Sequence, residues 1–229
     1  MSYPSIITQE GAVERNVEPI IEALSPLLDG IDNGHIMELG SGSYKHIEAF
    51  AKKWENVRWW GTVRNEIEQE IAGDRLEKEN VRLNNLHEPR IVDISNQRHW
   101  DEIYIAVRHG VAKQFSGFIM INLIHCCPID YSEKVFKSLS PRSTLDPKIL
   151  NPSKGWIVAY GPWLNDDGSY KSDQDEKFDR EYIKSKSPLL GLRSIKSISD
   201  IASKWGFVEE QRKQLPKGNM FAVWRVKSP

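Results

Sequence analysis

The stretch His35-Ile-Met-Glu-Leu-Gly-Ser-Gly-Ser43 decides how this chain folds. It is a short apolar run with one acid, then two glycines one residue apart, then a predicted helix over 44–54. A strand that ends in Gly-x-Gly and turns into a helix is typical of nucleotide sites, where Gly40 permits the tight turn and Gly42 removes a blocking Cβ. The third glycine of a dinucleotide fingerprint would stand where the chain has Lys45. The pattern therefore predicts a nucleotide-type pocket that differs from an ordinary dinucleotide site.

Outward from this stretch, predicted strands and helices alternate along the chain. Strands are expected at 35–39, 57–62, 90–94, 118–122 and 156–160, and helices at 9–29, 44–54, 65–82, 100–114, 132–139 and 197–205. Such alternation implies a parallel sheet with right-handed crossovers. Two final strands, at 207–211 and 220–226, are joined by a short turn and must be antiparallel to each other.

These elements predict an α/β fold with a mostly parallel, seven-stranded sheet and an antiparallel last strand. That Rossmann-like arrangement is similar to the class I methyltransferase fold. One domain over residues 1–229 suffices. Prolines make 140–154 an irregular insertion, and the polar segment 161–193 is expected to form a lid or substrate element.

Composition narrows the classes of function. The chain has 229 residues and a formal net charge of -1, which gives no bulk attraction to nucleic acid or to an anionic membrane. No apolar window is long enough to span a bilayer, and residues 1–5 contain no apolar signal core. The adjacent Cys126 and Cys127 favour neither a disulfide nor a metal site. We therefore expect a cytoplasmic protein that acts on a small molecule without a metal; its oligomeric state stays open.

The eight tryptophans are many for this length. Most are expected in the core, and some could wall a pocket for a flat or apolar ligand.

In open α/β sheets, ligands bind at the carboxyl ends of the strands. That edge collects residues 38–43, 62–65, 93–95, 122–127 and 160–163. The pattern Glu38-x-Gly-x-Gly suits S-adenosylmethionine, because the backbone can approach the methionine part while the acid holds its ammonium group. The same pattern also fits a plain strand-to-helix turn.

The second and third strands carry the next candidate positions. An acid that grips the ribose hydroxyls is expected near the end of the second strand, which instead reads Gly61-Thr-Val-Arg64-Asn65. An arginine there could meet the 2′-phosphate of NADP, but the terminal hairpin and the missing third glycine argue against that. Asp93 is placed to accept from an adenine amino group; its alternative role is to cap the following turn.

Asn122-Leu-Ile-His125 follows the fourth strand, where methyl transfer would occur. His125 is a candidate general base, because histidine ordinarily titrates near neutral pH. Its alternative role is that of a packed loop histidine.

The chain resembles the methyltransferase-like protein 26 family of class I S-adenosylmethionine-dependent methyltransferase-like proteins, nearly end to end. The residues that carry the resemblance are Glu14-Arg-Asn16, Pro19-Ile20, Glu38-Leu-Gly-Ser-Gly42, His46, Asp93-Ile94, Trp100, Asn122-Leu-Ile-His125, Pro128, Phe136, Tyr160-Gly-Pro162, Gly168, Phe178-Asp179, Pro188, Gly191-Leu-Arg193, Pro216 and Asn219. The resemblance implies a single methyltransferase domain with Arg15 and Asn16 over the methionine end of the cofactor. These two residues could equally form a salt-bridge cluster at a helix start.

Taken together, the expected cofactor-binding residues are Arg15, Asn16, Glu38, Gly40, Ser41, Gly42, Arg64, Asp93, Ile94 and Asn122. The chain departs from the family at the cofactor loop, where Tyr44 and Lys45 replace small or amide side chains. It departs again at Arg64, near which the family has an acid. A cation at either place opposes a cationic cofactor by about 1 kcal/mol in water, and losing the acid costs about 1–3 kcal/mol.

Three hypotheses follow. The first is an S-adenosylmethionine-dependent methyltransferase of a small molecule, in which proximity provides most of the catalysis. The second is a methyltransferase fold repurposed for cyclisation or isomerisation, with His125 or Tyr160 as acid or base. The third is a non-catalytic binding protein.

Overall fold

The computed structural model describes residues 11–227. Its seven-stranded sheet has the order β3-β2-β1-β4-β5-β7-β6. The strands are β1 His35–Leu39, β2 Arg58–Val63, β3 Arg90–Ile91, β4 Phe115–Ile121, β5 Trp156–Gly161, β6 Phe207–Gln214 and β7 Met220–Val226. β7 pairs antiparallel with both β5 and β6, and all other pairs are parallel. The predicted fold is confirmed.

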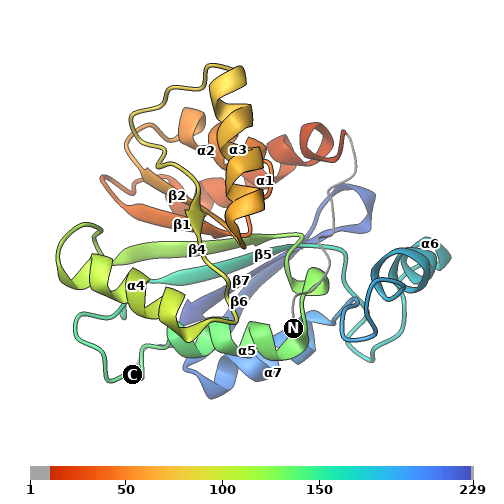
Figure 1. Cartoon of the computed structure of the whole chain (residues 1–229). Helices are drawn as coiled ribbons and strands as arrows, with labels where there is room; N and C mark the ends of the chain where they lie inside the picture. The colour runs from red at the N-terminus through yellow and green to blue at the C-terminus, as the bar shows by residue number, and fades with distance from the viewer. Residues whose placement is uncertain (1–10, 228–229) are drawn as a thin grey trace.

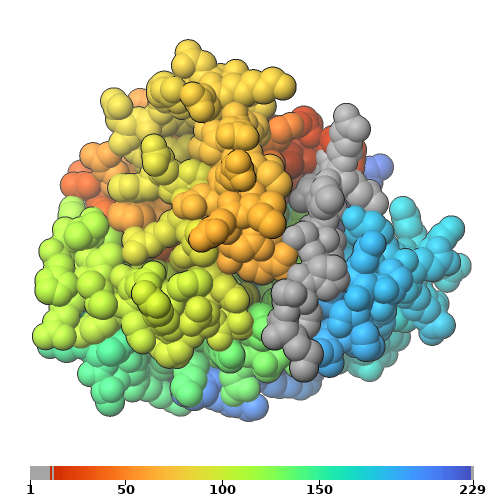
Figure 2. Space-filling model, in the orientation of Figure 1, coloured from red at the N-terminus to blue at the C-terminus, as the bar shows by residue number. Residues whose placement is uncertain are grey.

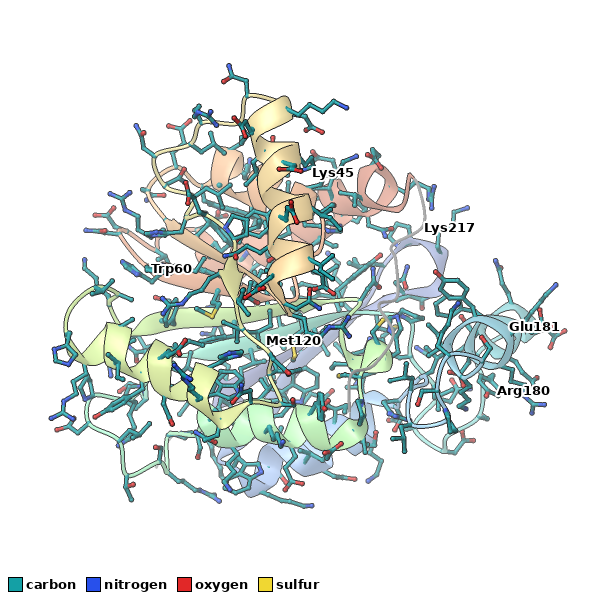
Figure 3. All side chains as sticks on the ribbon, viewed as in Figure 1. Lys45, Trp60, Met120, Arg180, Glu181 and Lys217 are labelled. Atoms are coloured by element: carbon teal, nitrogen blue, oxygen red, sulfur yellow. The ribbon has the colours of Figure 1, made fainter. Side chains whose placement is uncertain are left out.

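Helices cover both faces of the sheet (Figure 1). α1 Ala12–Leu28, α2 Lys45–Lys53 and α3 Glu66–Lys78 lie on one face, and α4 Gln97–Arg108, α5 Ile129–Ser138 and α7 Ile195–Lys204 lie on the other. Each face has its own apolar cluster. β1 and β5 are buried along their whole length, which accounts for their mainly apolar sequences, although β1 also buries His35 and Glu38. Met120 lies in the middle of the sheet in Figure 3.

Several element bounds differ from the prediction. The third strand ends at Ile91 rather than at 94, α4 starts at Gln97 rather than at 100, β4 starts at Phe115 rather than at 118, α3 ends at Lys78, and β6 continues to Gln214. α4 starts early because the side chain of Asn96 accepts a hydrogen bond from the backbone N–H of Arg98 at 3.0 Å. The first helix begins at Ala12; residues 9 and 10 of that prediction lie outside the described residues.

The segment 161–193 contains regular structure beyond the end of β5 (Figure 1). It holds α6 Asp173–Lys177, which continues into a π-helical turn, η2 Phe178–Ile183. Seven of the eight tryptophans are buried in the core, and Trp205 packs against one of the two apolar clusters. None of the helices within residues 11–227 is long and apolar enough to cross a membrane.

Candidate functional site

The turn after β1 is built on left-handed backbone. Gly40 has φ 71° and Gly42 has φ 53°. A Cβ on Gly40 would lie 3.0 Å from Cδ1 of Leu123, whereas a Cβ on Gly42 would meet nothing within 4 Å. Gly40 is therefore needed by the packing of the turn itself. Gly42 faces open space that a ligand could approach.

Ser41 ties this turn to β2. Its backbone N–H donates to the carbonyl of Thr62 at 2.7 Å, and its hydroxyl accepts from the N–H of Thr62 at 3.1 Å. The Thr62 hydroxyl in turn accepts from the N–H of Gly40 at 3.0 Å and donates to the carbonyl of Glu38 at 3.0 Å. The buried Ser41 thus supports the turn from inside the protein, which is a different task from the cofactor contact predicted for it.

Glu38 is the unusual group of the site. Its side chain is 1% exposed, and its Oε2 has no hydrogen-bond partner. Burial raises the pKa of Glu38 from 4.5 to about 7, and the hydroxyl of Ser41 lowers it by a smaller amount. A buried carboxyl without a full set of partners is costly, and the cofactor role of Glu38 stays a prediction.

Tyr44 and Lys45, the two departures from the family in the cofactor loop, each have contacts elsewhere in the fold. Tyr44 is fully buried in the core, and a Cβ on Gly61 would collide with its ring. Lys45 donates to Oε1 of Glu14 at 2.9 Å, so an acid on α1 balances this cation at the protein surface. Lys45 points toward α1 in Figure 3. The expected opposition of Lys45 to a cationic ligand is therefore reduced.

Arg64 is also paired. Its Nη2 lies 3.1 Å from Oε1 of Glu68, and its backbone N–H donates to Oε2 of Glu68 at 2.9 Å. The acid that the sequence appeared to lack near β2 is thus supplied from the first turn of α3. The signal for it, Asn65 followed three residues later by Glu68, is a helix-capping pattern.

Asp93 and Ile94 follow β3. Oδ1 of Asp93 accepts from the N–H of Ser95 at 2.8 Å, and the backbone N–H of Asp93 donates to Nδ1 of His99 at 2.9 Å. The capping role of Asp93 is therefore real. Ile94 is buried, and its carbonyl accepts from Nε1 of Trp100 at 2.9 Å.

Beside this loop is an open hollow of about 630 Å³, lined by Arg64, Asn65, Glu66, Ile67, Ile91, His99 and Glu102. Figure 2 shows the same face, with α3 in orange beside α4 in yellow-green.

The ends of β4 and β5 bring two of the sequence candidates, Asn122 and His125, together beside Gly161. Asn122 adopts φ 53°, and a Cβ on Gly161 would lie 3.2 Å from its Oδ1 and 3.6 Å from the ring of His125. Tyr160 belongs to the apolar cluster on the other face of the sheet. The Cβ position of Gly161 faces Asn122 and His125. Because neighbouring strand residues point to opposite faces, the side chain of Tyr160 points away from His125. Burial raises the pKa of Tyr160 to about 12, which keeps it protonated at neutral pH.

His125 sits in a single turn of 3-10 helix, Ile124–Cys126, against the segment 161–193. Its ring meets the ring of Phe178 edge-on, with centroids 5.8 Å apart. Burial lowers the pKa of His125 to about 4, while the carboxylate of Asp179 acts in the opposite direction. His125 is therefore neutral at pH 7, and the near-neutral pKa assumed from the sequence does not apply in the folded chain.

Sequence reasoning gave no site role to Asp179. It is fully buried and accepts hydrogen bonds from the hydroxyl of Tyr170 at 2.9 Å and the N–H of Leu192 at 2.8 Å. Its Oδ2 also lies 2.6 Å from Nζ of Lys184. One carboxylate thus ties three positions of the segment 161–193 to one another. No local sequence pattern predicts that an acid such as Asp179 is buried.

Arg15 and Asn16 lie on α1, which packs against α2. Arg15 is exposed and folds back toward Gly11, and Asn16 is half-buried. Within the described residues, no hydrogen bond or ion pair joins either of them to Glu38 or to the glycine turn, so their cofactor role stays a prediction. No group of three His, Cys, Asp or Glu that could hold a metal occurs within residues 11–227.

The sequence of this chain matches a known protein family. The sequence model of a family described as "Protein of unknown function (DUF938)" matches residues 8–226. The chain belongs to this family.

Similarity to solved structures shows the fold class of this chain. An O-methyltransferase family protein from Burkholderia thailandensis is 9% identical with a TM-score of 0.70, covering 95% of this chain and 58% of that chain. Human N-acetylserotonin methyltransferase in complex with SAM is 10% identical with a TM-score of 0.67, covering 94% and 53%. A SAM dependent methyltransferase from Aquifex aeolicus is 10% identical with a TM-score of 0.59, covering 95% and 94%. The chain spans little more than half the length of the first two, and it has the class I methyltransferase fold.

Proposed function

We propose that this protein binds S-adenosylmethionine in the turn after β1 and methylates a small molecule. The observation that carries the proposal is Glu38, a buried carboxyl whose Oε2 has no partner, directly before the glycine turn. The sheet order and the antiparallel β7 supply the matching framework. A chain with a formal net charge of -1 gives no reason to propose a nucleic acid or a membrane as partner.

The residues present fit such a cofactor. Glu38 would accept a hydrogen bond from the ammonium group of the cofactor. The open space at Gly42 would admit the methionine part of the cofactor. Asp93 and Ile94 would face the adenosine part, with Asn122 between the two ends. Arg15 and Asn16 would cover the methionine part from α1. When bound, the cofactor supplies an electrophilic methyl group.

The substrate side is proposed at Asn122, His125 and Gly161, under the segment 161–193. A neutral His125 can accept a proton from a substrate hydroxyl, and the nearby Asp179 stabilises the imidazolium that this produces. Tyr160 lies on the other face of the sheet from His125 and its hydroxyl stays protonated, so we assign it no acid or base step in this proposal. Positioning of the acceptor atom would provide most of the rate.

We also propose the closer relation to the methyltransferase-like protein 26 family, a single domain and a cytoplasmic location. The support is the residues 14–16 and 122–125, which match that family's more specific pieces.

A second candidate is a repurposed fold that catalyses cyclisation or isomerisation. One observation favours it: β2 itself carries no acid, and ends in Val63 before Arg64. A non-catalytic binding protein is the third candidate. Calorimetry with S-adenosylmethionine separates the first proposal from both, because the first expects binding in the micromolar range and the other two expect none.

The two glycines give a matched pair of variants. We expect Gly40→Ala to lower the free energy of unfolding by about 2–4 kcal/mol, because the left-handed backbone and the contact with Leu123 both resist a Cβ. Gly42→Ala costs only the backbone term, about 1–2 kcal/mol, yet we expect it to reduce cofactor affinity at least tenfold. Urea denaturation and calorimetry on both variants check this; a Gly42→Ala protein that binds as well as wild type would contradict the proposed approach of the ligand.

A further inference from the structure

The end of β2 has no acid on the strand. Val63 is buried in the core, and Arg64 follows it. In nucleotide-binding α/β sheets an acid close to this point accepts hydrogen bonds from the ribose hydroxyls. The strand alone therefore leaves the ribose of an adenosyl ligand without its usual acceptor.

Glu68 returns a carboxylate to this place. It lies in the first turn of α3, whose N-cap Asn65 accepts from the N–H of Glu68 at 3.0 Å. Oε2 of Glu68 accepts from the backbone N–H of Arg64 at 2.9 Å, and Oε1 lies 3.1 Å from Nη2 of Arg64. This reciprocal capping folds the side chain back along its own helix. The carboxylate is thus held near the end of β2, although Glu68 comes five residues after Val63.

The end of β2 lies between two parts of the proposed cofactor site. On one side, Thr62 bonds to Gly40 and Ser41 of the glycine turn. On the other side, the carbonyl of Val63 accepts from the N–H of Val92 at 2.7 Å, one residue before Asp93. A carboxylate here can therefore reach a ligand that extends from the glycine turn to Asp93.

Access and charge also suit this role. The side chain of Glu68 is 28% exposed, so it is held in place and still reachable. The hollow lined by Arg64 and Asn65 opens beside it, on the face of α3 shown in Figure 2. An ionised carboxylate offers about four acceptor sites, so it can serve several donors at once.

We propose that Glu68 accepts hydrogen bonds from the ribose hydroxyls of the adenosyl ligand, in place of an acid on the strand. Arg64 then orients the Glu68 carboxylate and does not bind a ligand phosphate. This inference rests on the proposed function, because it needs an adenosyl ligand in the site. The competing role for Glu68 is helix capping alone, which predicts no dependence on the ligand's hydroxyls.

The test measures hydroxyl preference by calorimetry, with S-adenosylhomocysteine and its 2′-deoxyribose analogue as probes. We expect the wild-type protein to prefer the hydroxyl-bearing ligand at least tenfold. Glu68→Gln should bind S-adenosylhomocysteine at least tenfold more weakly and prefer it less than threefold. Glu70→Gln, an exposed acid on the same helix, is the matched control and should behave as wild type.

A second variant distinguishes a loss of ligand preference from a loss of folding. Glu68→Asp keeps the charge but shortens the side chain, and should also lose the preference; melting temperatures of all variants are compared first. If folded Glu68→Gln and Glu68→Asp keep the wild-type preference, the inference is wrong while the proposed function stands. If wild-type protein binds neither probe, both are overturned.

Discussion

Replacing Glu38 by glutamine is expected to stabilise the protein at pH 8 while it weakens cofactor binding. Glu38 is almost completely buried, and one of its oxygens has no partner. Burial raises the pKa of Glu38 from 4.5 to about 7. The folded chain therefore resists ionisation of a group that ionises freely when unfolded.

The direction of this stability change follows from the linkage between proton binding and folding. Because the folded pKa lies above the unfolded pKa, stability is fully present below about pH 4.5 and is lost as pH rises to about 7. At 1.36 kcal/mol per pKa unit, the ionisable carboxyl costs about 3 kcal/mol at pH 8 and about 1 kcal/mol at pH 5. Glu38→Gln does not titrate and avoids this cost.

Urea denaturation of wild type and Glu38→Gln at pH 5 and pH 8 measures the effect. The stability difference between the two proteins should grow by about 2–3 kcal/mol in favour of the variant as pH rises. Glu55→Gln, at an exposed position, is the control and should change stability by less than about 0.5 kcal/mol at either pH. A pH-independent difference for Glu38→Gln would show that the carboxyl is not desolvated.

Binding of S-adenosylmethionine should move in the opposite direction, with at least a tenfold loss in Glu38→Gln. A glutamine keeps the shape but not the charge that an ammonium group needs. A variant that gains stability and loses affinity is what a ligand-binding carboxyl predicts; one that gains stability and keeps affinity would assign Glu38 no binding role.

The second large effect is expected at Asp179. Its carboxylate is fully buried and holds Tyr170, Lys184 and Leu192 at 2.9, 2.6 and 2.8 Å. Replacing it by asparagine removes the charge from all three contacts. Hydrogen bonds to charged groups contribute about 1.5–3 kcal/mol each, and Lys184 is exposed enough to turn to solvent, so a loss of about 3 kcal/mol is expected.

This loss should concentrate in the segment 161–193, because the partners of Asp179 all lie within it. Limited proteolysis of Asp179→Asn should therefore cut between residues 161 and 193 at least tenfold faster than in wild type. Glu181→Gln is the control: Figure 3 shows Glu181 on the outer side of this segment, and it should be neutral. Unchanged proteolysis of Asp179→Asn would mean that this carboxylate does not fasten the segment.

The core of the fold was predictable because its signals are local. An apolar run ending in Gly-x-Gly predicts β1 and its turn, and the short turn before β7 requires an antiparallel strand. The end of β3 and the start of β4 were each wrong by three residues, and β4 ends one residue earlier than predicted, before the left-handed Asn122. Strand pairing and turn geometry outweigh the apolar pattern that predicts a strand's length.

The candidate site was harder, because its partners come from distant residues. Lys45 was interpreted as opposing the cofactor, yet Glu14 on α1 balances it. Tyr44 was interpreted as a departure from the small or amide side chain that the family has at this place, and the missing Cβ of Gly61 lets its ring enter the core. The capping pattern of Asn65 and Glu68 was visible in the sequence, and the prediction missed it, as it missed the Asn96 cap of α4.

The most direct measurement is isothermal titration calorimetry of the wild-type protein with S-adenosylmethionine at pH 7.5. A buried Glu38 with an unpartnered oxygen, an open Gly42 and paired Lys45 and Arg64 predict saturable binding in the micromolar range. No detectable heat or competition at millimolar ligand would contradict the account and leave the fold without this cofactor.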